Sequence, residues 1–169
     1  ERPIDAILML STLGAGGRAL QEFGLAHHIP VRAWLRFGAQ EPENASTLQA
    51  ADSRIRTGLN PAQLRDWYAL ADVVLVPSLV AGLDRVALEA QKMGVPVIVT
   101  RVGGLPEAVD PKQGIVIDVQ QRNGELIPDD RAAVDALRRL LSDEAYRQQK
   151  AQAGQRYVEQ RFGYDHLPE

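Results

Sequence analysis

Cysteine does not occur in this sequence of 169 residues, so disulfides, thiolate catalysis and cysteine-ligated zinc are excluded. Histidine is scarce, with three in the chain, and no two histidines have the spacing of metal ligands. We therefore expect no metal site. The lack of cysteine is compatible with a reducing compartment, and we expect a cytoplasmic location.

Long apolar runs and an excess of positive charge are also missing. No run approaches the about 20 residues that cross a bilayer, so we expect no membrane span. A formal net charge of −3 gives no electrostatic reason to propose nucleic acid as a partner. The overall composition, with 45% hydrophobic and 24% charged residues, is ordinary for a globular protein. The length predicts a single domain over residues 1–169.

Strand and helix patterns alternate along the chain, which predicts an α/β fold with a doubly wound, mostly parallel sheet of about six strands. The runs 72–77 and 95–100 are almost entirely apolar, as in strands that helices cover on both faces. The expected strands are 4–10, 31–37, 53–57, 72–77, 95–100 and 114–118. The expected helices are 18–27, a weak 47–51, 62–71, 85–94, one from the cap Asp130 to Leu141, and 142–160.

Particular residues mark the ends of these elements. Asn60 and Pro61 predict a helix start, because they place a side-chain oxygen at the cap and a proline in the first turn. The polar stretch 120–130 predicts a loop that contains a turn at Asn123-Gly124.

A glycine turn follows each of the two most apolar strands. The first turn contains Gly82, and the second contains Gly103 and Gly104. In parallel sheets, ligands bind beyond the carboxyl ends of the strands, against the N-termini of helices. Both turns fall at that edge, so we place the candidate site there.

Four segments resemble, in the same order, the carboxyl-terminal domain of the GT-B glycosyltransferases. They are Leu70-Ala-Asp-Val-Val-Leu-Val-Pro-Ser-Leu-Val, Ala87-Leu-Glu-Ala with Gly94-Val-Pro-Val, Val102-Gly-Gly-Leu-Pro-Glu, and Arg156-Tyr-Val-Glu-Gln-Arg-Phe-Gly-Tyr. The similarity is to the large retaining family (group 1, or family 4, type) that includes sucrose synthase, glycogen synthase and many bacterial polysaccharide enzymes. It extends from about Arg54 to the end and implies the Rossmann-like half of a GT-B fold.

The resemblance implies that the domain binds a nucleotide-diphosphate sugar as a substrate and needs no cofactor. An N-terminal acceptor-binding domain or a partner subunit, absent from this chain, would bind the acceptor. The family carries two glutamates separated by seven residues, and the later one, which accepts hydrogen bonds from both ribose hydroxyls, aligns with Glu89. Ala81 stands where the family has the earlier glutamate, which contacts the transferred sugar.

A second departure from the family pattern comes immediately after Ala81. The family has Gly-Phe-Gly at these positions, and this chain has Gly82-Leu83-Asp84. As an N-cap, Asp84 would stabilise the next helix by about 1 kcal/mol. The same carboxylate would occupy the positive helix end that a donor phosphate needs, and would repel a pyrophosphate by roughly 1 to 4 kcal/mol. A third interpretation is that Asp84 reaches the sugar hydroxyls in place of the lost glutamate. The first two interpretations are compatible with each other.

The first loop departs from the family as well. Family members carry an arginine and a lysine there that clamp the pyrophosphate, generally without a metal. The arginine position here is Ser11 or Thr12, and Arg18 is the only cation near the lysine position. Gly14 belongs to a glycine-rich stretch whose backbone N–H groups could approach a phosphate, or that could form a plain turn.

Three functions remain open from the sequence. The first is the nucleotide-sugar-binding domain of a glycosyltransferase, with catalytic residues unassigned and the isolated chain inactive because the acceptor half is missing. The second is a degenerate, non-catalytic relative that has become a binding or assembly module. The third and weakest is a domain of a nucleotide-sugar epimerase. The retained Glu89 favours the first function, whereas Ala81 and Asp84 favour the second.

Overall fold

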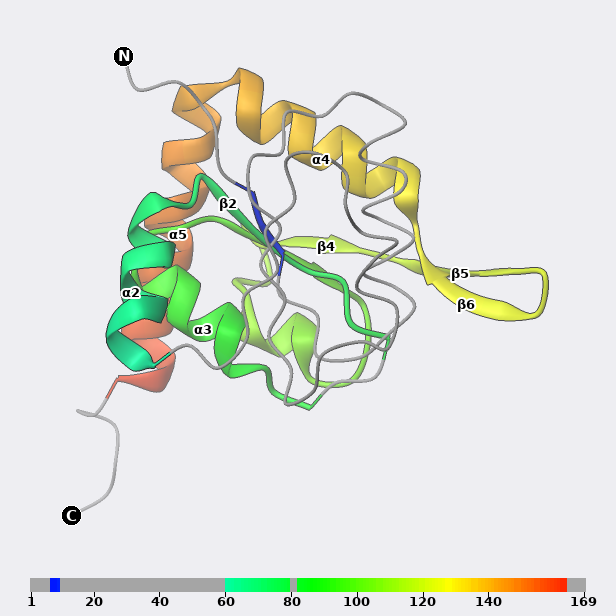
Figure 1. Ribbon diagram of the computed structural model, residues 1–169, viewed down its shortest axis with the longest axis horizontal. Helices are drawn as coiled ribbons and strands as arrows, with labels where there is room; N and C mark the ends of the chain where they lie inside the picture. Colours follow the sequence, from blue (N-terminus) through cyan, green and yellow to red (C-terminus); the bar gives the residue numbers. More distant parts are fainter. Residues whose placement is uncertain (1–6, 10–59, 80–81, 164–169) are drawn as a thin grey trace.

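The computed structural model describes residues 7–9, 60–79 and 82–163, which form an α/β fold around a parallel sheet (Figure 1). Four strands pair in the order β1 (Ile7–Met9), β2 (Val73–Val76), β3 (Val97–Thr100) and β4 (Ile115–Ile117). All three pairings are parallel, and the register places Val74 beside Val97 and Ile98 beside Ile115. The expected α/β class with a parallel sheet is confirmed.

The strands β2 and β3 are buried along their whole length. Because side chains alternate along a strand, Val73 and Leu75 enter the core on one face of the sheet, while Val74 and Val76 enter the core on the other. If either face of the sheet were exposed to solvent, the apolar side chains on that face would be exposed as well. The sheet therefore requires helices on both sides.

Helices provide that cover on each face. They are α2 (Pro61–Leu70), α3 (Arg85–Lys92), the short 3-10 helix η2 (Leu105–Ala108), α4 (Asp130–Ser142) and α5 (Glu144–Phe162). Helix α4 packs on the face that carries Val73 and Leu75, and α2, α3 and η2 pack on the opposite face. Figure 1 shows α4 above the sheet and α3 below it. Helix α5 contacts both α3 and α4 and so joins the two layers.

Helix α2 begins at Pro61, as Asn60 and Pro61 predicted. The Asn60 side chain accepts a hydrogen bond from the Gln63 backbone N–H at 2.9 Å, and the Gln63 side chain accepts one from the Asn60 N–H at 3.0 Å. This reciprocal pair satisfies two N–H groups that the helix leaves without partners. The helix packs through Tyr68, which is buried, and through Leu64 and Trp67 beside it.

The stretch 120–130 was expected to be a loop, and that expectation is wrong. The strands β5 (Val119–Arg122) and β6 (Glu125–Pro128) pair antiparallel, and the hairpin extends away from the sheet in Figure 1. Its turn is the expected one, with φ of 53° at Asn123 and 84° at Gly124, as two-residue hairpin turns require. The strand signal was hidden because β5 is mostly polar and lacks apolar alternation.

The cap of α4 is Asp129 rather than the expected Asp130. The Asp129 side chain accepts from the Ala132 N–H at 3.0 Å. Asp130 is instead the first helical residue, is buried, and accepts a hydrogen bond from the Arg122 guanidinium at 3.0 Å. Two adjacent acids fit the same cap signal in the sequence, and in the structure Asp129 caps the helix while Asp130 pairs with Arg122 of the hairpin.

Several expected elements fall outside the described residues. They are the strands 31–37 and 53–57 and the helices 18–27 and 47–51. The strand expected at 4–10 is described as Ile7–Met9. None of the described helices is both long enough and apolar enough to cross a membrane.

Helices α3 and α5 approach each other closely at Gly154. A Cβ atom at this position would lie 2.8 Å from the Gln91 Oε1 atom and 2.9 Å from its Cγ atom. The Gln91 side chain is buried, and its amide donates hydrogen bonds to the carbonyls of Ala87 at 2.8 Å and Ala108 at 2.7 Å. It cannot move aside without losing these bonds.

We expect Gly154→Ala to lower the free energy of unfolding by about 1 to 3 kcal/mol, because the overpacking outweighs the better helix propensity of alanine. Urea unfolding followed by circular dichroism measures the change. In a double-mutant cycle with Gln91→Ala, the glycine substitution should cost less than it does alone. If Gly154→Ala costs no more in the protein that has Gln91 than in the Gln91→Ala variant, the close contact between the two residues is contradicted.

Candidate functional site

The two glycine turns meet at the carboxyl ends of β2 and β3. A Cβ atom at Gly104 would lie 2.9 Å from the Leu83 backbone nitrogen and 3.1 Å from the Gly82 carbonyl carbon. Gly103, beside it, has φ of 53°, a conformation that glycine adopts without strain. The structure thus brings together Gly82, Leu83, Gly103 and Gly104, four of the predicted site residues. Their role in donor binding stays a prediction.

A hydrogen bond joins the ends of the same two strands beneath these turns. The Thr100 hydroxyl donates to the Ser78 carbonyl, and both residues are fully buried. The Ser78 hydroxyl is also buried and has no hydrogen-bond partner among the described residues. The carboxyl ends of β2 and β3 are therefore joined by packing and by a hydrogen bond from a side chain to the main chain, beneath the two glycine turns.

Asp84 caps helix α3, as one interpretation of the sequence predicted. Its carboxylate accepts a hydrogen bond from the Val86 backbone N–H at 2.8 Å. The negative charge therefore sits at the positive end of the helix. The Val86 N–H group would otherwise be available to an anionic ligand, so the cap competes with a phosphate at this position.

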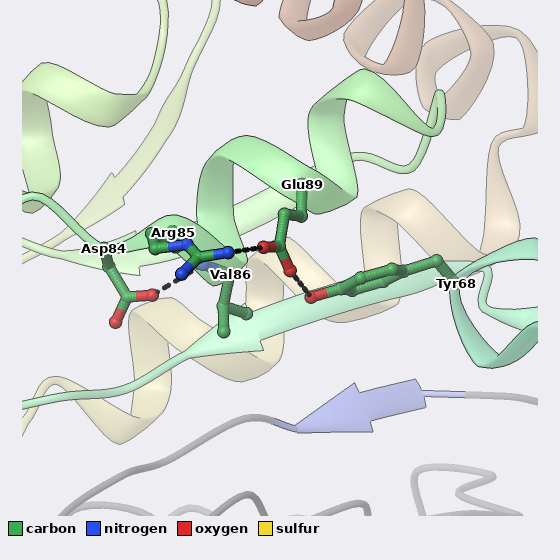
Figure 2. Close-up of polar contacts among 5 residues, drawn as sticks. All are labelled: Tyr68, Asp84, Arg85, Val86 and Glu89. Carbon is green, nitrogen blue, oxygen red and sulfur yellow. Dashed lines mark hydrogen bonds and ion pairs between the residues drawn. The ribbon is translucent and has the colours of Figure 1, made fainter. Parts of the chain in front are cut away.

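Glu89 lies in the second turn of α3, between two donors (Figure 2). The Tyr68 hydroxyl donates to its Oε2 atom at 3.3 Å, and the Arg85 guanidinium donates to its Oε1 atom at 3.3 Å. The Glu89 side chain is 36% exposed, so the carboxylate remains accessible to a ligand. Each oxygen has used one acceptor position and retains another, which is the arrangement that a pair of adjacent hydroxyls needs.

Tyr68 faces Glu89 from helix α2 and is fixed in the core. It is 2% exposed and packs with the residues of the core beneath α2 and α3. Burial raises the pKa of the Tyr68 hydroxyl far above its usual value, and the negative charge of Glu89 raises it further. Tyr68 is therefore neutral at physiological pH and acts as a hydrogen-bond donor to the carboxylate.

A groove of about 520 Å³ runs along α3 between α2 and the end of α5. Its polar part contains Tyr68, Arg85 and Glu89, and its apolar part contains Leu88, Val158 and Phe162. This volume lies within the range of small-molecule sites. The groove therefore gives the Glu89 carboxylate an open space beside an apolar wall.

Other predicted residues fall outside this arrangement. Gly14, Arg18 and Ala81 lie outside the described residues. Apart from these predicted residues, Arg101 follows β3 and forms an exposed ion pair with Asp118 at 2.6 Å. Within the described ranges, no group of His, Asp and Glu side chains could hold a metal ion.

The partners of Glu89 were missed by sequence reasoning. Tyr68 belongs to the core, and nothing in the sequence indicated that its hydroxyl would reach a carboxylate 21 positions along the chain. Arg85 stands four residues before Glu89, a spacing that brings two side chains together on a helix. That spacing was the only available signal.

Comparison with known proteins identifies relatives over most of the chain. The family model described as "Glycosyl transferases group 1" matches residues 25–143. The D-inositol 3-phosphate glycosyltransferase of Corynebacterium jeikeium is 34% identical over 149 residues, which make up 87% of this chain and 29% of that protein. The enzyme of the same name from Xylanimonas cellulosilytica is 41% identical over 104 residues, 61% of this chain and 23% of that protein. The chain spans less than a third of these curated relatives.

Solved structures share the fold at lower identity. Sucrose-phosphate synthase from Thermosynechococcus elongatus aligns with a TM-score of 0.75 and 24% identity, over 97% of this chain and 43% of that one. The C-terminal domain of LpcC, a group 1 family glycosyl transferase from Francisella tularensis, aligns with a TM-score of 0.71 and 19% identity. The alignment covers 96% of this chain and 88% of that one. Anabaena HepE in complex with UDP-glucose aligns with a TM-score of 0.72 and 18% identity, over 94% of this chain and 45% of that one. These structures confirm the GT-B type of fold.

The contact between the two glycine turns generates a paired prediction. We expect Gly104→Ala to lower the free energy of unfolding by about 1 to 3 kcal/mol, because its Cβ would strike the backbone of Leu83, which cannot rotate away. The matched control is Gly82→Ala, since a Cβ at Gly82 meets nothing within 4 Å. That control should change stability little or raise it slightly. Similar urea midpoints for the two variants would show that the turns do not touch.

Proposed function

The chain belongs to the group 1 glycosyl transferases, and from this membership we propose that it is the nucleotide-sugar-binding domain of an enzyme that transfers a sugar to an acceptor. The observation that carries the proposal is the Glu89 carboxylate, which is partly exposed at the groove and retains an acceptor position on each oxygen. A ribose offers two adjacent hydroxyls to such a carboxylate.

The ligand class is supported by the fold neighbours. The Anabaena protein is bound to UDP-glucose, a nucleotide-diphosphate sugar. The sugar and phosphates of such a donor would lie towards Gly82 and Gly104, where the two turns meet beyond the strand ends. The acceptor would bind to a further domain or a partner subunit, since this chain corresponds to 43% of sucrose-phosphate synthase and 29% of the corynebacterial relative.

A second candidate function is a degenerate binding or assembly module. The observation that favours it is the Asp84 carboxylate, which already occupies the N-terminus of α3. A negative charge there opposes the binding of a diphosphate. The two functions differ in whether a nucleotide diphosphate binds at all, and a direct titration separates them.

Calorimetric titration of the 169-residue chain with UDP, GDP and ADP tests the proposed function. We expect one of the three to bind, and Glu89→Ala to weaken that binding at least about tenfold, because hydrogen bonds to a charged acceptor are lost. Glu107→Ala is the matched control, since it removes an exposed carboxylate from η2 and should leave affinity unchanged. Binding of none of the three by the folded chain would favour the degenerate module.

Asp84 provides a further test of the phosphate position. Asparagine caps helices about as well as aspartate does, so Asp84→Asn should keep α3 intact while removing the charge. We expect the variant to bind the preferred nucleotide diphosphate about two- to tenfold more tightly at low salt, with less gain at high salt. The corresponding nucleoside, which carries no phosphate, should bind both proteins equally. Unchanged or weaker binding of the diphosphate would place the phosphates away from Asp84.

A further inference from the structure

The contact between Tyr68 and Glu89 joins a fixed side chain to a flexible one. Tyr68 is 2% exposed, and its ring is held in the core beneath α2 and α3. Glu89 has three rotatable side-chain bonds and projects into the groove, where its carboxylate would otherwise sample several positions. The hydrogen bond of 3.3 Å from the Tyr68 hydroxyl restricts that freedom.

Arg85 is a weaker restraint on the same carboxylate. Its side chain is 89% exposed, and its ion pair with Glu89 joins positions four apart on one helix. Exposed pairs of this kind contribute little, because solvent screens the charges and the long side chain must be ordered. The buried phenol is therefore the principal anchor of the carboxylate.

The direction of the Tyr68 bond is also fixed. Burial, and then the charge of Glu89, raise the pKa of Tyr68, so the hydroxyl keeps its proton and donates. A carboxylate that receives a hydrogen bond on its Oε2 atom keeps another acceptor position on that atom. The contact thus orients Glu89 without using up its capacity to accept from a ligand.

We propose that Tyr68 is a positioning residue, which holds the Glu89 carboxylate in the orientation that accepts the two hydroxyls of a ribose and so selects ribonucleotide donors. This inference rests on the proposed nucleotide-sugar function. Tyr68 does not touch the ligand in this proposal, since its ring is buried and its hydroxyl is occupied by Glu89. Its contribution is to reduce the freedom that the carboxylate would lose on binding.

The experiment compares the preferred nucleotide diphosphate with its 2′,3′-dideoxy form, by calorimetry on the 169-residue chain. The wild-type protein should bind the ribonucleotide more tightly than the dideoxy form. We expect Tyr68→Phe, which keeps the ring and removes only the hydroxyl, to weaken ribonucleotide binding about three- to tenfold and leave dideoxy binding unchanged. In a Glu89→Ala background the same substitution should have no further effect on the ratio of the two affinities.

Each other outcome has a definite meaning. A ratio that Tyr68→Phe leaves unchanged overturns the positioning role and leaves the proposed function standing. Equal weakening of both ligands shows a general structural role and also overturns it, and urea unfolding of the variant accompanies this readout. Arg85→Gln is the matched control on the other carboxylate oxygen and should change the ratio less than Tyr68→Phe does. Binding of no nucleotide by the folded wild-type chain overturns the proposed function and this inference together.

Discussion

The burial of β2 and β3 on both faces is the constraint on which the rest of the structure depends. Strand residues that alternate between two apolar cores need a helix on each side, and a parallel pairing requires each strand to be reached by a crossover. Every turn that leaves a strand then lies at the same edge of the sheet. This is why turns that are separated in the sequence, at Gly82 and Gly104, come into backbone contact.

The position of Glu89 follows from the same packing. Helix α3 buries Ala87 and Ala90 against the sheet, and successive residues of a helix are about 100° apart around its axis. Glu89 is therefore turned to the side of the helix rather than towards the strands. Helix α2 lies on the same face of the sheet and buries Tyr68 in the same core, which brings its hydroxyl to that side. The polar contact is a consequence of how two helices share one apolar layer.

The elements from Asn60 onwards were predictable because their signals are local. Apolar runs, the capping residues Asn60 and Pro61, and the spacing of apolar side chains in the helices define them without reference to distant parts of the chain. The hairpin was missed because β5 is mostly polar, and the cap at Asp129 was missed because two adjacent acids fit the same cap signal.

The candidate site was predictable as a list of positions but not as an arrangement. Glu89 and Asp84 were identified by resemblance, whereas the bond from Tyr68 and the need for glycine at position 104 depend on tertiary packing. The arrangement also separates two parts of α3. In the proposed donor complex, Glu89 would serve the nucleoside half of the donor, while Asp84, five residues earlier, would face the half that carries phosphate. A carboxylate attracts hydroxyl donors and repels phosphate oxygens, so the two acids would act in opposite directions on that ligand. If the domain binds such a donor, its affinity would be set by the balance between the two acids, and a change at Asp84 would alter that balance without removing either hydrogen bond that Glu89 accepts.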